Sequence, residues 1–460
     1  MNSYPRLVIA GTHSGVGKTT VTLALLSAFT RRGRRVQAFK AGPDFIDPGH
    51  HTQATGRPSR NLDGWMLGED VNRRMFGRAA ADADLSIIEG MMGLFDGSSS
   101  VNEIGSTAEL AKQLASPVLL VVDASAMARS VAAIVTGYAK FDCGLRVGGV
   151  LFNRVGSDGH YRLLREAVEA ETAIPVVGYL KPDTSLAIED RHLGLVTAQE
   201  GAYGDLYGRL AEAAMETIDL DRLEALAKSA GSLPSVQGMP SSISKNERTV
   251  RVGLAYDSAF CFYYRDNLDL FEAGGAELVP FSPLNDQMLP NVDMLYLGGG
   301  YPELYAAKLA GNASMRQAVR SFAEAGGVLY AECGGMMYLT QSIRDLEGRT
   351  HDMVGLFPAE AVMSRTMMHL GYRELQIVED CVLGAAGTRA RGHEFHYSTL
   401  EARGPLHYAG MLTDAQGSDK GPDGLVFRNT LASYTHLHFG NEPALARSLL
   451  AAAHIRVGSR

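Results

Sequence analysis

The chain has 460 residues, of which 46% are hydrophobic and 20% are charged, and its formal net charge is −8. This length exceeds one ordinary hydrophobic core and predicts two or three globular domains. The acidic balance argues against a general affinity for nucleic acid or anionic membranes, and no apolar run reaches the length of a membrane span.

Short apolar runs alternate with helical patterns through the first half of the chain. The runs of buried-strand type are residues 6–10, 35–40, 85–90, 117–124, 147–154 and 174–180, and helical spacing occurs over Thr19–Arg31, Ser106–Leu114 and Tyr161–Glu171. Alternation of this kind predicts a parallel β-sheet covered by helices on both faces.

The first run leads directly into the glycine-rich segment GTHSGVGKTT, residues 11–20. Glycines allow backbone N–H groups to converge on a phosphate, a lysine can reach the phosphates, and a threonine hydroxyl can ligate Mg²⁺. The segment therefore predicts a P-loop that binds nucleotide through Gly15, Gly17, Lys18, Thr19 and Thr20. In the usual P-loop pattern, the first glycine would stand at the position that Thr12 occupies here. The glycine of this chain, Gly11, comes one residue earlier, so the loop is a lengthened variant.

Acidic residues follow the next two strands. Lys40, Asp44 and Asp47 come after the second run, and Glu89 and Asp96 after the third. Because the carboxyl ends of parallel strands gather at one crevice, we expect Thr19, Asp47 and Glu89 to hold Mg²⁺ and Lys40 to contact a phosphate. Asp44 and Asp96 are candidates for substrate or phosphate contact. Alternatively, Asp44 and Asp47 cap turns beside prolines.

Two further polar residues end later strands of this half. Asn153 is a candidate for adenine recognition through its amide, and Asp123 is a candidate neighbour of the metal. Hydrogen bonding within local turns is the alternative for both residues.

A change in composition divides the chain. Residues 229–249 are rich in Ser, Pro and Gly and predict a linker between a domain at 1–228 and a domain at 250–460. Apolar runs at 250–257, 276–283, 292–300 and 326–335 begin a second α/β unit, and its last part is richer in β patterns.

The segment GGVLYAECGG places Cys333 between an apolar strand and a helix. Such a turn resembles a nucleophile elbow, in which the N–H groups of Gly299, Gly300 and Gly334 would form an oxyanion hole. His436 and, in reserve, His438 are candidates for the base. The alternative for Cys333 is a small buried hydrophobic residue.

The remaining cysteines lack such a setting. Cys143, Cys261 and Cys381 lie far apart and without CxxC spacing, which predicts packing residues rather than disulfides or zinc ligands. With no secretory pattern at the N-terminus, we expect a cytoplasmic protein.

These motifs together resemble the cobyrinic acid a,c-diamide synthase family, through KAGPDFIDPGHH, IEGMMGLFDG, IEDRHLGL, GGGYPELY, LGYRE and RGHEFHYS. The resemblance implies an α/β protein with an N-terminal P-loop NTPase domain of dethiobiotin-synthetase type. Its C-terminal domain would be of the class I glutamine amidotransferase type. It also implies ATP and Mg²⁺ as cofactors and glutamine hydrolysis at Cys333. In related amidotransferases a Glu stands two residues after the catalytic His, where this chain has His438.

The same resemblance implies a corrinoid polycarboxylate as substrate, amidated on its a and c acetates through acyl phosphates by a monomer or homodimer. Candidate substrate contacts are His50, Arg191 and His192, with His51, Arg391, His393 and His396 as further candidates. The same chemistry on nickel-sirohydrochlorin or hydrogenobyrinic acid is an alternative. Cobyric acid synthesis and a non-catalytic P-loop switch fit the motifs less well.

Overall fold

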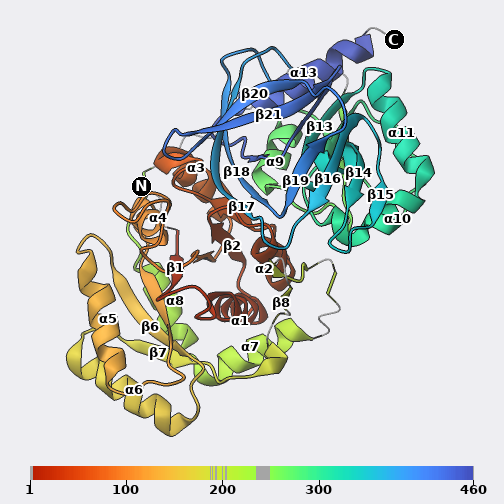
Figure 1. Cartoon of the computed structure of the whole chain (residues 1–460). Helices are drawn as coiled ribbons and strands as arrows, with labels where there is room; N and C mark the ends of the chain where they lie inside the picture. The colour runs from red at the N-terminus through yellow and green to blue at the C-terminus, as the bar shows by residue number, and fades with distance from the viewer. Residues whose placement is uncertain are drawn as a thin grey trace. The chain divides into compact units, whose positions relative to one another are not determined.

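The computed structural model describes residues 4–458 except 187, 189, 192–193, 199, 202–204 and 235–248. The chain separates into two compact units, Met1–Met239 and Pro240–Arg460 (Figure 1). Most of the predicted linker at 229–249 lies outside the described residues, so its extent stays a prediction.

The first unit is built on a seven-stranded sheet in the order β3-β2-β4-β1-β5-β6-β7, and all of its strand pairs are parallel. Its strands are β1 (Arg6–Gly11), β2 (Val36–Ala41), β3 (Arg60–Leu62), β4 (Leu85–Glu89), β5 (Val118–Asp123), β6 (Val147–Asn153) and β7 (Val176–Tyr179). The strands are almost wholly buried because helices cover both faces, as the continuous apolar runs predicted.

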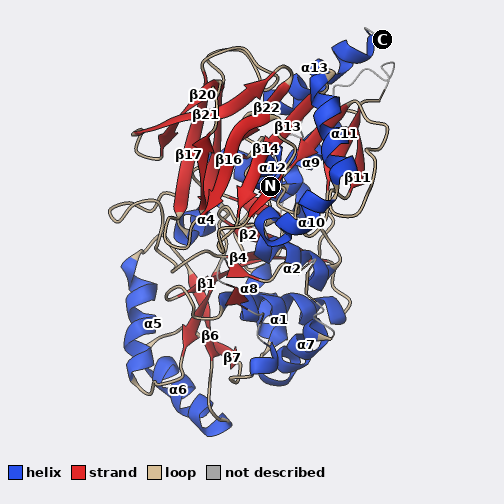
Figure 2. Cartoon of the chain, turned by 45° about the vertical axis from the view of Figure 1, so that its right-hand side comes forward, coloured by secondary structure: helices blue, strands red, loops and turns tan. Residues whose placement is uncertain are grey.

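Eight helices surround this sheet in the described part of the first unit. They are α1 (Lys18–Arg31), α2 (Ile46–Thr55), α3 (Gly68–Ala80), α4 (Thr107–Gln113), α5 (Ser130–Phe141), α6 (Asp158–Glu171), α7 (Leu206–Thr217) and α8 (Leu220–Lys228). Figures 1 and 2 show α1 and α7 on one side of the strands and α5 and α6 on the other. A two-residue pair, β8 (Asp190–Arg191) and β9 (Gly194–Leu195), precedes α7.

The second unit has a ten-stranded mixed sheet in the order β11-β10-β12-β13-β22-β21-β20-β17-β18-β23. Its first five strands pair in parallel: β10 (Arg251–Ala255), β11 (Glu277–Phe281), β12 (Met294–Leu297), β13 (Val328–Glu332) and β22 (Thr430–Ser433). The antiparallel part contains β17 (His369–Ile377), β18 (Arg389–His396), β20 (Tyr408–Asp414), β21 (Asp419–Phe427) and β23 (His436–Leu437). This antiparallel half is the β-rich region that the sequence predicted.

Two hydrophobic cores lie on opposite faces of the parallel strands. Side chains alternate along β12, so that Leu295 and Leu297 join one core while Met294 and Tyr296 join the other. The first core includes α10 (Ala306–Gly311), α11 (Ala313–Glu324) and α12 (Gly334–Leu339), and the second includes α9 (Arg265–Ala273) and α13 (Ala444–Gly458). A smaller sheet adds β14 (Thr340–Arg344), β15 (Thr350–Asp352), β16 (Phe357–Met363) and β19 (Ser398–Ala402).

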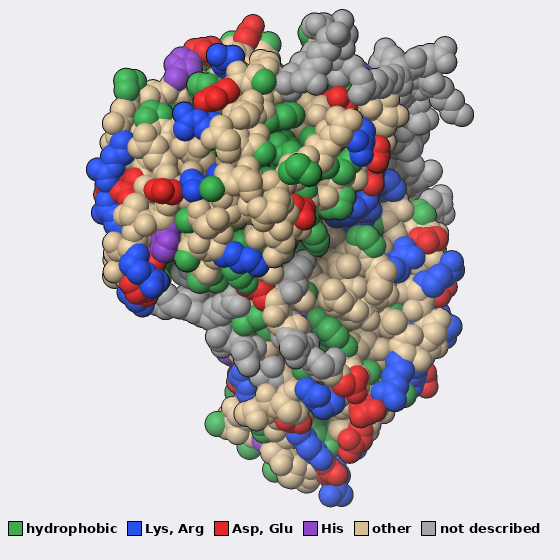
Figure 3. All heavy atoms as spheres, turned by 90° about the vertical axis from the view of Figure 1, so that its right-hand side faces the viewer, with side chains coloured by type: hydrophobic (Ala, Val, Ile, Leu, Met, Phe, Trp, Pro, Cys, Tyr) green, Lys and Arg blue, Asp and Glu red, His purple; other side chains and the backbone are tan. Residues whose placement is uncertain are grey.

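The surface carries mixed charge. On the face drawn in Figure 3, Lys and Arg side chains are interspersed with Asp and Glu side chains. In the residues that the structure describes, every helix is too short or too polar to cross a membrane.

Candidate functional site

The glycine-rich loop connects β1 to α1, which begins at Lys18. Gly17 adopts a left-handed conformation with φ of 92°, and a Cβ atom there would lie 2.1 Å from Nδ2 of Asn153. Nδ2 of Asn153 also donates to the carbonyl of Val16 at 2.9 Å. The amide that we expected to bind adenine is therefore engaged in holding the loop, and the close approach explains why position 17 is glycine.

Arg154, for which the sequence predicted no role, also supports the loop. It donates to the carbonyl of Gly15 at 3.0 Å and forms an ion pair with Asp123. Asp123 further accepts from the N–H of Ser125 at 3.0 Å. These contacts match the local-turn alternative for Asp123 rather than a place beside a metal.

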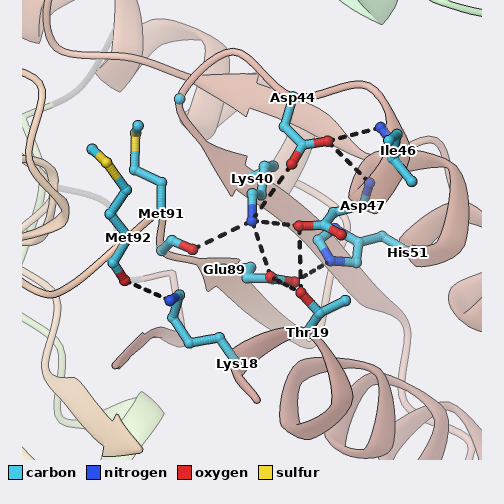
Figure 4. A network of polar contacts seen from close by, with 12 residues as sticks. Lys18, Thr19, Lys40, Asp44, Ile46, Asp47, His51, Glu89, Met91 and Met92 are labelled. Atoms are coloured by element: carbon cyan, nitrogen blue, oxygen red, sulfur yellow. Dashed lines mark hydrogen bonds and ion pairs between the residues drawn. The ribbon is translucent and has the colours of Figure 1, made fainter. Parts of the chain in front are cut away.

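A buried cluster of charged side chains lies behind the loop (Figure 4). The ammonium of Lys40 on β2 is 2.5 Å from Oδ2 of Asp47, 3.0 Å from Oε1 of Glu89 and 3.9 Å from Asp44. The hydroxyl of Thr19 donates to Oε1 of Glu89 at 2.8 Å. Residues from β2, α1, α2 and β4 are thus brought to one place, as the parallel sheet predicted.

The charges of this cluster depend on one another. Burial and the neighbouring carboxylates raise the pKa of Asp47. Burial also acts to raise the pKa of Glu89. Lys40 and His51 outweigh this effect and hold the pKa of Glu89 below its usual range. Conversely, Asp47 and Glu89 outweigh burial and raise the pKa of Lys40. The carboxylates therefore require a cation, and Lys40 supplies one.

His51 orients Glu89. Its Nε2 is 2.7 Å from Oε2 of Glu89 and its Nδ1 is 3.2 Å from the hydroxyl of Ser59, and the ring is fully buried. From the sequence, His51 was a candidate only for substrate contact. His51 lies one helical turn after Asp47 in α2, but because the sequence did not predict this helix, the spacing could not be recognised beforehand.

The donor set fits Mg²⁺. Thr19, Asp47 and Glu89 present a hydroxyl and carboxylate oxygens, which are the ligands that this hard cation prefers. The described residues contain no group of three His, Cys, Asp or Glu side chains arranged to hold a metal by themselves. Such a partial set is typical of a metal that also binds substrate phosphates.

The other predicted residues of the first unit have varied surroundings. Asp44 accepts from the N–H groups of Ile46 and Asp47 in the turn before α2, as its turn alternative predicted, and it also faces Lys40. Asp96 accepts from the N–H of Gly93 at 2.8 Å. Thr20 follows Thr19 in α1.

The substrate candidates of the first unit gain little support. Both ring nitrogens of the fully buried His50 are engaged, by Tyr207 and the carbonyl of Val196, and this favours a packing role instead. Arg191 is described only as part of β8, and His192 lies outside the described residues.

In the second unit, Cys333 occupies a sharp turn between β13 and α12, with φ of 47° and ψ of −104°. Positive φ in a residue other than glycine costs about 1–3 kcal/mol and marks strained functional turns. A Cβ on Gly334 would lie 3.1 Å from the backbone nitrogen of Gly300, so the two predicted oxyanion segments approach closely. Burial and nearby carboxylates raise the pKa of the Cys333 thiol, although the N–H of Gly334 acts in the opposite direction.

His436 lies on β23 against Gly299. A Cβ on Gly299 would be 2.3 Å from Cε1 of this ring, so the glycine makes room for the imidazole. The ring also stacks on His393 at 5.0 Å. Burial, with a smaller effect of His396, lowers the pKa of His436 to about 3, so the imidazole is neutral at pH 7 and able to accept a proton.

His438 has a different environment. It packs against Tyr264 with ring centroids 4.4 Å apart, and its Nδ1 accepts from the N–H of Gly440 at 3.1 Å. These contacts favour a structural role and leave His436 as the better candidate for the base.

The further candidates of the second unit are engaged within it. Arg391 pairs with Glu374, His393 contacts the hydroxyl of Tyr264, and His396 donates to the carbonyl of Ser398. None of the four cysteines, all of which lie in the described part of the chain, forms a disulfide, and Cys333 is the buried one.

Acid will weaken the second unit through its buried histidines. Burial lowers the pKa of His438 from 6.5 to about 3. Because the folded state binds fewer protons than the unfolded state between these values, its stability is complete above pH 6.5 and falls as the pH drops. We expect His438→Phe to reduce the loss of unfolding free energy between pH 7.5 and pH 5 by about 2 kcal/mol, measured by urea denaturation. An unchanged pH dependence would contradict this assignment.

Both units of the chain are similar to known protein families. The family model described as CobQ/CobB/MinD/ParA nucleotide binding domain matches residues 7–195, and that of the CobB/CobQ-like glutamine amidotransferase domain matches residues 251–444. A cobyrinate a,c-diamide synthase of Syntrophotalea carbinolica is 47% identical, covering 97% of this chain and 98% of the relative. Synthases of the same name from Salmonella typhimurium and Picrophilus torridus are 43% and 42% identical, covering 97% and 95% of this chain and 97% and 96% of the relatives.

Proposed function

The chain belongs to the cobyrinate a,c-diamide synthase family, and on this premise we propose that it amidates the a and c acetates of cobyrinic acid with nitrogen from glutamine. The observation that carries the proposal is the presence of two built sites in one chain. One is the P-loop with its Lys40–Asp47–Glu89 cluster. The other is the Cys333 turn, where Gly334 approaches Gly300 and the adjacent Gly299 packs against His436.

Carboxylate activation belongs to the first unit. A carboxylate does not react with ammonia because its leaving group is too poor, whereas an acyl phosphate does. The substrate carboxylate would attack the γ-phosphate of ATP, ADP would leave, and ammonia would then displace inorganic phosphate. Gly15, Gly17 and Thr20 would hold the nucleotide phosphates, with Lys18 and Lys40 countering their charge.

Thr19, Asp47 and Glu89 would hold Mg²⁺, which supplies charge neutralisation for the phosphates. Lys40 pairs with the same two carboxylates, Asp47 and Glu89. If Mg²⁺ neutralised these carboxylates, the ammonium of Lys40 could bind phosphate oxygens instead. His51 would keep Glu89 in one orientation through the 2.7 Å contact.

Ammonia would come from the second unit. His436 takes the thiol proton, the sulfur of Cys333 attacks the amide carbon of glutamine, and the tetrahedral oxyanion is stabilised by N–H groups of Gly299, Gly300 and Gly334. Ammonia leaves with the proton from His436, and water then hydrolyses the thioester to glutamate. We infer further that the enzyme acts in the cytoplasm as a monomer or homodimer.

Mass spectrometry of the products tests the proposal. The enzyme is incubated with ATP, Mg²⁺ and glutamine, together with cobyrinic acid, hydrogenobyrinic acid or nickel-sirohydrochlorin. Double amidation of cobyrinic acid in clear preference is expected, since the relatives carry that name. Preference for another macrocycle would retain the mechanism and replace the substrate. Absence of any amidation would refute the proposal.

The two histidines can be separated by matched substitutions. We expect His436→Asn to lower the rate of glutamine hydrolysis by about 10²–10⁴-fold, because it removes the base, whereas His438→Asn should change it by less than about fivefold. Release of glutamate from glutamine measures both variants. A larger effect at His438 would exchange their roles.

A further inference from the structure

A carboxylate that the mechanism above does not use lies directly before the nucleophile. Glu332 ends β13 and is 1% exposed. It shares a face of the strand with Tyr330, which belongs to an apolar core. No Lys or Arg in the described part of the chain forms an ion pair with it. A carboxylate buried in this way is costly and is a candidate for a functional role.

Three donors hold this carboxylate in one orientation. The hydroxyl of Tyr330 donates to Oε1 at 2.7 Å, and the hydroxyl of Tyr296 donates to Oε2 at 2.9 Å. The backbone N–H of Leu437 also donates to Oε1, at 3.0 Å. Because Leu437 follows His436 directly, Glu332 anchors the strand that carries the candidate base.

The same carboxylate faces the imidazole. Oε2 of Glu332 lies 4.0 Å from Nδ1 of His436, and the two side chains are 1% and 2% exposed. This separation is too long for a hydrogen bond but is well within the range of strong interaction between buried charges. His438, in contrast, stands in sequence where related enzymes have their Glu, but packs on Tyr264.

We propose that Glu332 is the acidic partner of the Cys333–His436 pair, a positioning residue that orients the imidazole and stabilises its protonated form. This inference rests on the proposed glutamine hydrolysis. In related amidotransferases, the acidic partner of the histidine is a Glu two residues after it. Here Glu332, the residue before the Cys333 nucleophile, would take this role.

The need for such a partner follows from the burial of the pair. Burial lowers the pKa of His436 to about 3, and burial also raises the pKa of Cys333, so proton transfer from thiol to imidazole is unfavourable by itself. A negative charge 4.0 Å from Nδ1 favours the imidazolium, although the same carboxylate also acts to raise the pKa of the Cys333 thiol. Glu332 therefore assists the proton transfer by making the imidazole a stronger base.

The charge of Glu332 is itself set by its surroundings. Burial raises its pKa to about 7, although the bonds from Tyr330, Leu437 and Tyr296 act in the opposite direction. Other titratable groups near the pair include His393, stacked on His436 at 5.0 Å, and His396, and burial lowers the pKa of both. Besides burial, Glu303, Glu332 and Glu394 act to raise the pKa of Cys333.

Glu332→Gln separates the charge from the structural anchor. The amide oxygen of glutamine can still accept from the N–H of Leu437 and the hydroxyl of Tyr330, but the negative charge is lost. We expect kcat for glutamine hydrolysis to fall by about 10²-fold with KM changed by less than about threefold. In the wild type we expect kcat/KM to rise with pH near 7 as Glu332 ionises, and in the variant this rise should be absent. A purely structural anchor would leave both unchanged.

Two further variants make the result decisive. Tyr330→Phe keeps the carboxylate but removes one donor to its charged form, so the rise of kcat/KM should move to higher pH. Asp423→Asn is the matched control, since Asp423 is a buried carboxylate that bonds Ser433 and Thr435 in the turn before His436. This control should retain the wild-type pH profile.

The outcomes are distinct. A wild-type kcat and pH profile in Glu332→Gln, or an unmoved profile in Tyr330→Phe, overturns the inference while leaving the proposed function intact. Amidation from ammonium salts by each variant shows that the chain is folded. A wild-type enzyme that hydrolyses no glutamine overturns the proposed function and this inference with it.

Discussion

We expect Cys333→Ala to lower glutamine hydrolysis and glutamine-dependent amidation by about 10⁴-fold or more, because no other group can form the thioester. Amidation from ammonium salts should remain near the wild-type rate, since free ammonia bypasses the thiol. Alanine keeps the Cβ of cysteine, so the backbone strain at φ of 47° is unchanged and the fold is not relieved or disturbed. Product formation with each nitrogen donor is the measurement.

The remaining cysteines provide the control. Cys143, Cys261 and Cys381 form no disulfide and lie outside the strand–helix turn. Cys261→Ala and Cys381→Ala should therefore retain glutamine-dependent activity. If Cys333→Ala still hydrolyses glutamine, the nucleophile has been assigned to the wrong residue. If it loses activity with ammonium salts as well, Cys333 has a role in folding or in the first unit's reaction.

Lys40→Met is expected to have the opposite effect to Cys333→Ala, because it should stop amidation but not glutamine hydrolysis. It should abolish amidation with either nitrogen donor, by about 10²–10³-fold or more, because a positive group facing the phosphates is removed. Glutamine hydrolysis at Cys333 should persist. The variant should also lose about 3–5 kcal/mol of unfolding free energy, because Asp47 and Glu89 remain buried without the ammonium 2.5 Å and 3.0 Å away.

A double variant tests the cause of this destabilisation. Adding Asp47→Asn to Lys40→Met removes one of the uncompensated charges, so part of the lost stability should return, although the single Asp47→Asn variant is not stabilising. Urea denaturation of the two single variants and the double variant completes the cycle. Strictly additive losses would mean that the two side chains do not interact in the folded protein.

Local sequence was sufficient for much of the fold. The predicted apolar runs that end at Ala10, Lys40 and Gly90 correspond to β1, β2 and β4 within one residue at each end, because buried parallel strands need continuous apolar segments. Asp47 was expected at the end of the second strand, but it lies in the first turn of α2. The sequence did not predict this helix, because the prolines and histidines of residues 43–51 are not typical of a helix.

Side-chain partners depended on tertiary contacts. Asn153 bonds Val16, 137 residues away, and Glu332 bonds Leu437, 105 residues away. No local pattern contains such pairs, since they arise where strand ends meet. The same holds for His436 and His438, which are two residues apart in sequence but differ in their neighbours, Gly299 for one and Tyr264 for the other.

The sequence by itself thus determined the two α/β units, the glycine-rich loop before Lys18 and the cysteine between strand and helix. These features depend on hydrophobic periodicity and on the conformations that glycine allows, which are properties of neighbouring residues. The sequence placed Lys40, Asp47 and Glu89 at one crevice, but only the tertiary structure decided that Lys40 pairs directly with both carboxylates and that Glu332 faces His436. The reason is that a buried charge is stable only beside a partner, and the sheet order brings partners together from distant parts of the chain.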